Sequence, residues 1–145
     1  MTTFDVVRPF DGAKIAILRG DDVLTLLRDD CPDIPYPNQW DLPGGGREGV
    51  ETPFATAARE LFEELSIKIE LSRVIYHVEE NGHSNPKTKV HFFVARWEEL
   101  ADQDVRLGDE GQCWAWMPAR GFTIRPDAVI SLRQRLTRAL DALGL

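Results

Sequence analysis

The sequence predicts an α/β protein in which helices pack on the faces of a mixed β-sheet. Three observations support this fold class. Short apolar, β-branched segments occur on both sides of a strongly helical segment, a second amphipathic helix follows the last of them, and strands and helices are therefore interleaved along the chain. With 145 residues, the chain is expected to form one domain over 1–145, because two separate cores would each be marginally stable.

The first expected strands are residues 14–19 and residues 22–27. Both are short apolar runs, and the Gly20-Asp21 pair between them is typical of a tight hairpin. Residues 29–38 contain three prolines, which exclude a helix or a central strand. This segment is therefore expected to be a loop that leads into the glycines at 44–46.

The clearest helix signal covers residues 52–65. Thr52 is a suitable N-cap, and Pro53 is well placed at the first helical position. At 100° per residue, one narrow apolar stripe emerges that is expected to face the sheet. Its members are Phe54, Ala58, Leu61 and Leu65.

The second half of the sequence predicts a long hairpin, one more strand and a final helix. Residues 73–80 and 89–97 are rich in β-branched and aromatic side chains, and the turn-forming segment 81–86 separates them. Residues 112–117 are a further short strand. After Pro126, apolar residues recur at helical spacing, namely Val129, Leu132, Leu136, Leu140 and Leu143.

Composition and charge exclude several classes of protein. Hydrophobic residues make up 43% and charged residues 28%, which argues against disorder and coiled coils. The net charge of −7 disfavours nucleic acid as a partner, although metal ions can still bring phosphates to an acidic chain. No apolar run has the length of a membrane span, and the N-terminus has no leader pattern, so neither a membrane nor export is expected and the interpretation is a cytoplasmic protein.

The two cysteines and three histidines form no recognisable metal or disulfide pattern. Cys31 and Cys113 are too few for a disulfide scaffold, so they are interpreted as buried or incidental thiols. His77, His83 and His91 lack zinc-ligand spacing and imply no zinc site.

Three glutamates on the 52–65 helix suggest a function. Glu60, Glu63 and Glu64 share the sector roughly opposite the apolar stripe, and Glu60 and Glu64 repel each other at i, i+4 by about 0.2–0.5 kcal/mol. A divalent cation turns such a cluster into a set of oxygen ligands. By themselves, however, three glutamates are also typical of a solvated helix face.

The glycines that precede this helix change that interpretation. Gly44, Gly45 and Gly46 allow backbone groups to approach an ion or a phosphate, and they match neither the phosphate loop GxxxxGK[ST] nor GxGxxG. Read together, the segment runs Gly45, five residues, Glu51, seven residues, Arg59-Glu60-Leu61, one residue, Glu63-Glu64, one residue, Ser66-Ile67. It resembles the Nudix hydrolase motif G-x5-E-x7-R-E-U-x-E-E-x-G-U, where U is aliphatic.

One position departs from the motif. Ser66 stands where the family has the glycine that ends the helix, and a left-handed turn there costs serine about 1 kcal/mol relative to glycine. The departure affects the loop conformation rather than the carboxylates.

The resemblance implies a fold and an activity. The fold is a Nudix-type α/β/α sandwich with a mixed central sheet, a catalytic helix after a Gly-rich loop, and a C-terminal helix. The activity is a Mg²⁺-dependent pyrophosphohydrolase, with Mn²⁺ as an alternative metal, that cleaves a small-molecule nucleoside diphosphate linked to another moiety. The leading substrate is a nucleoside triphosphate, including oxidised forms, cleaved to monophosphate and pyrophosphate.

Several alternatives stay open. ADP-ribose, dinucleoside polyphosphates and nucleotide sugars are other substrates, and a non-catalytic nucleotide sensor on the same fold is another function. An isoprenyl diphosphate isomerase is disfavoured because Cys31 lies in a different local setting. The sequence leaves the oligomeric state, monomer or homodimer, undetermined.

By the same resemblance, Glu60, Glu63 and Glu64 hold one or more divalent ions, and the Gly44 carbonyl is a further ligand. Arg59 orients Glu60, where the alternative is an ordinary surface ion pair. Glu51 steadies the loop, reaches the metal through water, or only places charge at the helix N-terminus.

Residues outside the motif complete the expected site. Glu110 resembles the glutamate that some MutT-like members use as catalytic base or extra metal ligand; Asp109 is its rival, and the base is left open between Glu60 and Glu110. The candidates for substrate binding are Arg28 at the phosphates, Gly45 in the glycine loop, Trp40 by stacking or else core packing, and Asp127 at a purine edge or else as a helix N-terminal residue.

Overall fold

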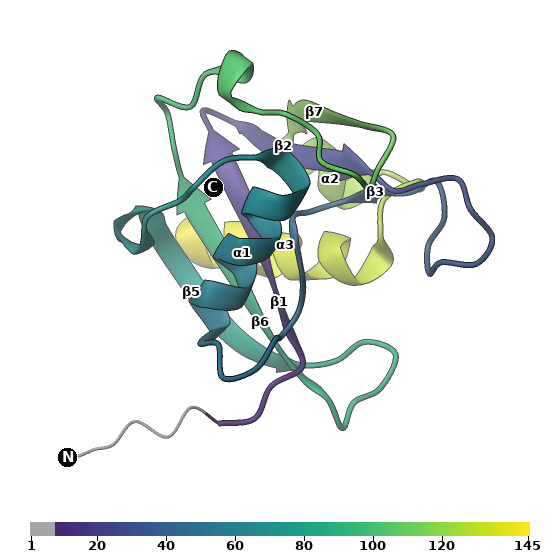
Figure 1. The fold of residues 1–145 in the computed structure, drawn as a ribbon. Coiled ribbons are helices and arrows are strands. Elements are labelled where there is room, and N and C mark those ends of the chain that lie inside the picture. The colour runs from purple at the N-terminus through teal and green to yellow at the C-terminus, as the bar shows by residue number, and fades with distance from the viewer. Residues whose placement is uncertain (1–7) are drawn as a thin grey trace.

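The computed structural model describes residues 8–145, and within them a seven-stranded mixed sheet forms the centre of the molecule (Figure 1). The strand order is β3-β2-β1-β6-β5, with β4 paired to β1 and β7 paired to β2. The strands are β1 (Gly12–Arg19), β2 (Asp22–Leu27), β3 (Trp40–Asp41), β4 (Gly44–Gly46), β5 (Val74–Asn81), β6 (Lys89–Arg96) and β7 (Cys113–Pro118).

The sheet is mixed because one central pairing is parallel. β1 and β6 run parallel from the Gly12–Val90 pair to the Leu18–Arg96 pair, whereas the other pairings are antiparallel. β1 and β2 form the expected hairpin, with Gly20 at a φ of +58° in its turn. β5 and β6 form the second expected hairpin.

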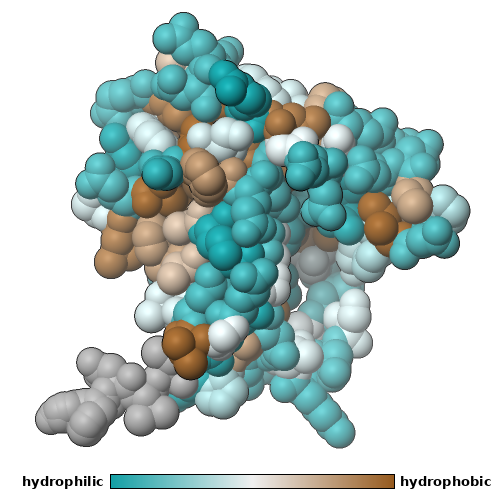
Figure 2. All heavy atoms as spheres, in the orientation of Figure 1, coloured by the Kyte–Doolittle hydropathy of each residue, from teal (hydrophilic) through white to brown (hydrophobic). Residues whose placement is uncertain are grey.

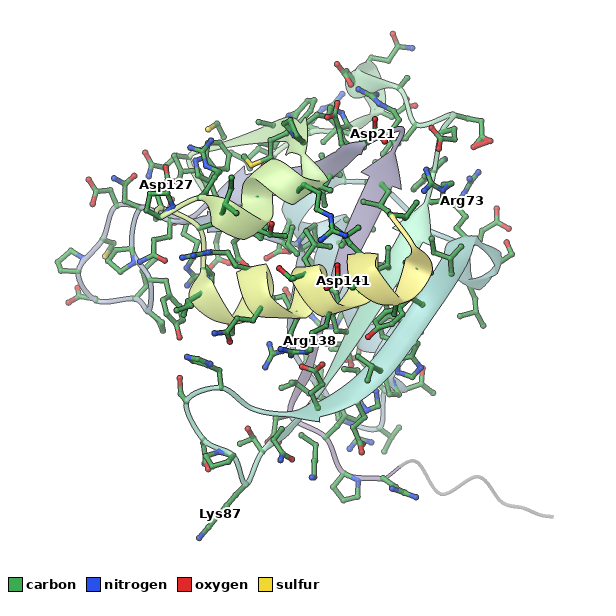
Figure 3. The ribbon with its side chains drawn as sticks, turned by 180° about the vertical axis from the view of Figure 1, so that it is seen from behind. Asp21, Arg73, Lys87, Asp127, Arg138 and Asp141 are labelled. Carbon is green, nitrogen blue, oxygen red and sulfur yellow. The ribbon has the colours of Figure 1, made fainter. Side chains whose placement is uncertain are left out.

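Helices cover both faces of this sheet. α1 (Pro53–Leu65) packs on one face against a core that includes Ile15 and Phe93. α2 (Ala119–Ile124) and α3 (Ile130–Leu143) pack on the other face, where Phe122 and Leu136 join a second core; Figure 3 shows α3 crossing that face. The expected α/β/α layering is therefore confirmed.

The termini of α1 follow from local sequence chemistry. The Thr52 hydroxyl accepts a hydrogen bond from the Ala55 amide at 3.2 Å, and Pro53 is the first helical residue. Leu61 and Leu65 are fully buried against the sheet. The opposite side of the helix, which faces solvent, is hydrophilic, as Figure 2 shows down the middle of the molecule. The helix ends at Ser66.

Two features differ from the sequence expectations. The glycines at 44–46, expected as a Gly-rich loop, form the short strand β4. Gly12 allows β4 to lie close to β1, because a Cβ on Gly12 would lie 2.6 Å from the Gly45 carbonyl oxygen. α2 was not predicted, since a helix of 6 residues is too short to display a periodic pattern.

Two further expectations concern the thiols and the membrane. Neither cysteine is buried: Cys31 is partly exposed and Cys113 is exposed, so of the two alternatives, buried or incidental thiols, the structure excludes the first. Among the helices of residues 8–145, none combines the length and the apolar character needed to cross a bilayer.

Replacing Leu61 by alanine tests the packing of α1. Leu61 is 0% exposed, so Leu61→Ala is expected to lower the free energy of unfolding by about 2–5 kcal/mol. The neighbouring Phe62 is 47% exposed, and Phe62→Ala is the matched control, with an expected loss below about 1 kcal/mol. Urea unfolding measures both; equal losses in the two variants would contradict this packing.

Candidate active site

The glycine strand β4 lies directly against the carboxylates of α1. The Gly44 amide donates to Glu64 Oε1 at 2.9 Å, and a Cβ on Gly45 would lie 2.6 Å from the carboxyl carbon of Glu60. Gly44 has a φ of +138°, and a side chain there would overlap the Ala13 carbonyl. Gly44 therefore has to be glycine because of β1, and Gly45 leaves the space in which the Glu60 carboxylate lies.

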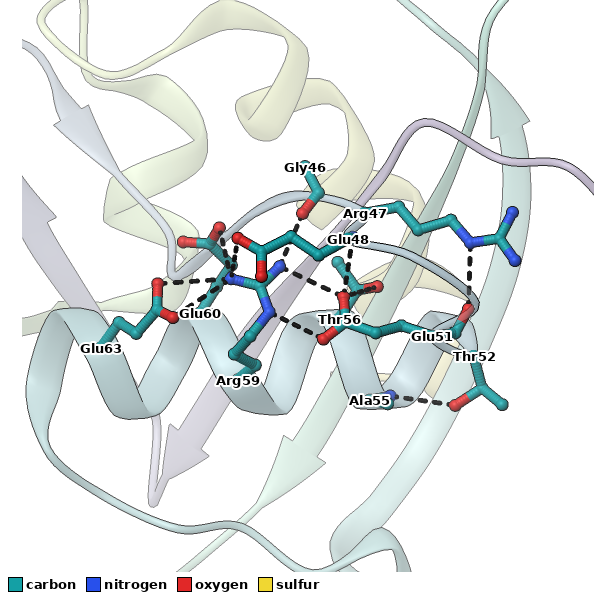
Figure 4. A network of polar contacts seen from close by, with 10 residues as sticks. All are labelled: Gly46, Arg47, Glu48, Glu51, Thr52, Ala55, Thr56, Arg59, Glu60 and Glu63. Carbon is teal, nitrogen blue, oxygen red and sulfur yellow. Dashed lines mark hydrogen bonds and ion pairs between the residues drawn. The ribbon is translucent and has the colours of Figure 1, made fainter.

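Arg59 is the centre of the polar network at this surface (Figure 4). Its Nη1 donates to Glu60 Oε2 at 3.1 Å and to both Glu63 oxygens at 3.3 Å. Its Nη2 donates to the Gly46 carbonyl at 2.7 Å, and its Nε donates to Glu51 Oε2, also at 2.7 Å. Through hydrogen bonds, one guanidinium thus joins the carboxylates of Glu51, Glu60 and Glu63 to the glycine strand, and a fourth carboxylate, that of Glu48, lies 3.4 Å from Nη1.

Glu51 anchors the segment between the glycine strand and the helix. Besides the Arg59 bond, Glu51 Oε1 accepts from the Glu48 amide at 2.9 Å and from the Thr56 hydroxyl at 3.0 Å. The Arg59 hydrogen bond is the main reason that the pKa of Glu51 falls from 4.5 to about 2. These contacts favour the loop-steadying role among the three alternatives for Glu51.

Glu64 is the most deeply placed of the three helix glutamates. Burial raises its pKa from 4.5 to about 7, while Lys14 and the Gly44 amide act in the opposite direction. Nearby Asp41 and Glu60 raise the pKa further. A carboxylate so placed lacks sufficient compensating charge, and a bound cation would supply it.

The carboxylates of Glu60, Glu63 and Glu64 are suitable ligands for a divalent cation, but they are not already arranged around one point. Within residues 8–145, no three acidic, histidine or cysteine side chains converge as a ready metal site. The reason is that Glu60 and Glu63 face Arg59 and Glu64 faces the Gly44 amide. Carboxylate oxygens are nevertheless the ligands that Mg²⁺ and Mn²⁺ prefer, and Gly45 leaves the space that the Glu60 carboxylate occupies.

An open groove of about 590 Å³ runs beside these glutamates. It is lined by Glu60, Phe62, Glu63, Glu64, Ser66, Gly108, Asp109 and Glu110. Asp109 and Glu110 thus both face the helix carboxylates. Only Glu110 of these two also lines the adjoining cavity of about 90 Å³ that contains Arg28 and Glu64, which distinguishes it from its rival.

Arg28 belongs to a partly buried charge cluster, centred on Asp41, that the sequence did not reveal. Asp41, whose side chain is 4% exposed, accepts from Arg28 Nη1 at 2.9 Å and from Lys14 Nζ at 3.1 Å. Lys14 Nζ also donates to the Gly44 carbonyl at 3.2 Å. The sequence signal that could have predicted this cluster was the pair of charged residues Lys14 and Asp41 beside apolar neighbours. Charged side chains in such positions are buried only when they are paired.

Trp40 and Asp127 lie outside the groove. Trp40 packs against the core beneath α3, and its amide donates to the Asp127 carbonyl at 2.8 Å. The Asp127 carboxylate pairs with Arg125 at 2.8 Å in the segment between α2 and α3 (Figure 3). The structure does not bring these two side chains together with Glu60, Glu64 and Glu110.

Comparison with known proteins identifies the family. The family model described as the NUDIX domain matches residues 9–139, nearly the whole chain. The chain therefore belongs to the NUDIX domain family, the Nudix hydrolases that the motif indicated. A relative in Bos taurus, named diphosphoinositol polyphosphate phosphohydrolase 3-beta, is 41% identical over 56 residues. That match covers 39% of this chain and about a third (34%) of the relative's own length.

Solved structures show the same fold. A MutT protein from Methanosarcina mazei Go1 superimposes with a TM-score of 0.68 at 22% identity, covering 92% of this chain and 95% of that chain. A bifunctional NMN adenylyltransferase/ADP ribose pyrophosphatase from Francisella tularensis, complexed with AMP and a manganese ion, gives a TM-score of 0.71 at 18% identity. It covers 92% of this chain and 42% of that chain. At such identities the likeness concerns the fold alone.

The Glu51–Arg59 contact predicts a specific acid sensitivity. Because the pKa of Glu51 is lower in the folded state, about 2 against 4.5, its contribution to stability is present above pH 4.5 and is lost as the pH falls toward 2. Glu51→Gln is expected to cost about 1–2 kcal/mol at neutral pH, and the difference from the wild type should shrink over that interval. Unfolding measured against pH checks this.

Glu48→Gln is the matched control, because the exposed Glu48 carboxylate lies 3.4 Å from Arg59 Nη1. It should leave the acid curve close to that of the wild type. If the difference in unfolding free energy between the wild type and Glu51→Gln stayed constant from pH 4.5 to 2, the ionised Glu51 carboxylate would not stabilise the fold through Arg59.

Proposed function

We propose that the chain is a Mg²⁺- or Mn²⁺-dependent pyrophosphohydrolase that cleaves a nucleoside diphosphate linked to another moiety. The observation that carries this proposal is the contact between β4 and α1. Gly44 and Gly45 lie against Glu64 and Glu60, and Arg59 joins the same strand and helix. The motif residues thus form one continuous polar surface along an open groove.

In this proposal, the site residues act as metal ligands, as a positioning residue and as a general base. Glu60, Glu63, Glu64 and the Gly44 carbonyl are the proposed metal ligands, and Arg59 holds Glu60 in place. A divalent cation held there would neutralise charge on the phosphate oxygens and make the attacking water easier to deprotonate. Glu60 or Glu110 accepts the proton of the attacking water, since both line the groove.

The phosphates are proposed to lie between the acidic groove and Arg28. Arg28 and Glu110 line one small cavity together with Glu64, so a phosphate chain entering it would meet both the guanidinium and the metal ligands. Arg28 Nη1 and Nε are held by Asp41 and by the Pro35 carbonyl, which fixes the direction of the guanidinium.

The leading substrate in this proposal is a nucleoside triphosphate, including oxidised forms. A cavity of about 230 Å³ on the far side of Arg28 supports a bulky group there, because Tyr36, Val129 and Leu132 give it an apolar wall. ADP-ribose, dinucleoside polyphosphates and nucleotide sugars satisfy the same geometry. Contact of Trp40 or Asp127 with a base stays a prediction: both lie outside the acidic groove, but the Trp40 carbonyl accepts from the amide of Val129, a residue of this cavity wall, at 3.0 Å.

One observation favours a second candidate, a highly phosphorylated compound that carries a diphosphate. The same cavity is lined by three basic side chains, Lys14, Arg28 and Arg135. Asp41 alone pairs with the first two, and Glu80 pairs with Arg135 at 3.1 Å, so their positive charge is neutralised only in part. A basic cavity suits several phosphate groups. The name of the bovine relative, a diphosphoinositol polyphosphate phosphohydrolase, agrees with this candidate.

A panel of substrates tests the proposal. Nucleoside triphosphates, 8-oxo forms, ADP-ribose, a dinucleoside tetraphosphate, a nucleotide sugar and a diphosphoinositol polyphosphate are incubated with Mg²⁺ or Mn²⁺, and the phosphorylated products are quantified. Metal-stimulated release from one of them supports the enzyme. Saturable binding without release on the whole panel would instead favour a nucleotide sensor.

Loss of a carboxylate on α1 is expected to abolish most of the turnover. Glu64→Gln or Glu63→Gln should lower kcat by about a hundredfold or more on the best substrate, because each removes a charged metal ligand. Glu70→Gln, an exposed glutamate beyond the helix, is the control and should match the wild type. Intact turnover in either α1 variant would refute the assignment of the metal ligands.

A second variant tests the close approach of β4 to Glu60. The added Cβ of Gly45→Ala would lie 2.6 Å from the Glu60 carboxyl group and displace it, so kcat/KM should fall by about tenfold or more. Gly46→Ala is the matched control, since its Cβ would lie 3.8 Å from the nearest atom outside its neighbours. Equal kinetics in the two variants would contradict the role of this contact.

A further inference from the structure

Ser66, the one departure from the motif, adopts the backbone conformation that favours glycine. It ends α1 at φ 66° and ψ 21°, in the left-handed region, and its amide donates to the Phe62 carbonyl at 2.9 Å. A serine is less stable than a glycine in this conformation. Its side chain, however, makes a contact that glycine cannot make: the hydroxyl donates to the Arg106 carbonyl at 2.9 Å.

Arg106 begins a loop that is docked on the last turn of α1. The Arg106 amide donates to the Leu65 carbonyl at 3.0 Å, and the Gly108 amide donates to the Glu64 carbonyl at 2.8 Å. The last carbonyls of a helix have no partner within the helix, so the loop supplies them. A Cβ on Gly108 would overlap the Glu63 carbonyl, which shows how closely the loop lies on the helix.

The other end of the loop is fixed to β2. The Gly111 amide donates to Asp29 Oδ1 at 3.1 Å, and the Gln112 amide donates to the Leu27 carbonyl at 2.8 Å. Glu110 therefore projects from a short segment held between two anchors. It faces the groove that Glu60 and Glu64 also line.

We propose that Ser66 is a positioning residue that ties the loop 106–111 to the end of α1 and thereby holds Glu110 over the groove. This inference rests on the proposed function, in which Glu110 acts on the attacking water or the metal. Ser66 also lines this groove, but its hydroxyl donates to the Arg106 carbonyl.

The size of the effect follows from the contacts. The Ser66 hydroxyl is exposed, and two backbone hydrogen bonds remain when it is removed, so the loop should loosen without leaving the helix. The accompanying change in stability depends on the replacement. Glycine relieves the left-handed strain, whereas alanine keeps it.

Two variants, Ser66→Gly and Ser66→Ala, separate the tether from stability. Both lose the hydroxyl, so amide exchange within residues 106–111 of the metal-free protein is expected to accelerate by about three- to tenfold in each. Melting temperatures should differ, with Ser66→Gly at or above the wild type and Ser66→Ala below Ser66→Gly. If loop exchange in Ser66→Gly equals that of the wild type, the tether is refuted.

Kinetics test whether the tether positions Glu110. In Ser66→Gly and Ser66→Ala, kcat is expected to fall about three- to tenfold while KM stays within about twofold, since the loss concerns the reacting geometry rather than uniform binding. Adding Ser66→Gly to Glu110→Gln should cause no further loss of kcat if Ser66 acts through Glu110. A full additional loss would overturn the positioning role.

The two assignments can fail separately. Wild-type turnover in Glu110→Gln would remove Glu110 from the proposed function and with it the positioning role of Ser66. Unchanged loop exchange in Ser66→Gly would overturn the tether even where Glu110→Gln is inactive. Exchange is measured without metal or nucleotide, so its outcome does not depend on the identity of the substrate.

Discussion

The site depends on how one helix keeps several carboxylates close together in partly buried surroundings. Glu60, Glu63 and Glu64 repel one another, and burial adds a desolvation cost at Glu64. Arg59 offsets part of this repulsion by binding Glu60 and Glu63, and the Gly44 amide offsets another part at Glu64. The remaining negative charge is the physical reason to expect a cation at this surface.

The glutamate charges on α1 can be partly offset because β4 contacts the helix through backbone groups rather than side chains. The strand β4 consists of glycines only, and β1 contributes Gly12 opposite it, so amides and carbonyls reach distances that a Cβ would prevent. The Gly46 carbonyl accepts from Arg59 while the Gly44 amide donates to Glu64. The glycine segment is thus a paired strand of the sheet that presents polar backbone groups to the helix.

Both faces of the sheet carry an apolar core, one under α1 and one under α2 and α3. The acidic groove lies on the outer side of α1. Lys14, Arg28 and Asp41 connect this groove to the α3 side, because their cluster reaches the Gly44 carbonyl and lines the cavity that extends toward α3. A long phosphorylated compound bound in the acidic groove would extend past Arg28 toward this basic cavity.

The sequence by itself determined strands β1, β2, β5, β6 and β7, the main helix, the final helix and the family, because each depends on local periodicity, caps or the fixed spacing between Gly45 and Ile67. It did not predict β3 and β4, whose 2 and 3 residues are too few to show a strand pattern. The sequence did not predict α2, because its 6 residues are too few to show a helical period. The tertiary structure alone decided which site residues meet. It brought Glu110 and Arg28 to Glu64, left Trp40 and Asp127 apart from them, and paired Lys14 with Asp41. Such meetings depend on the packing of segments far apart in the chain, and no pattern within one segment carries that information.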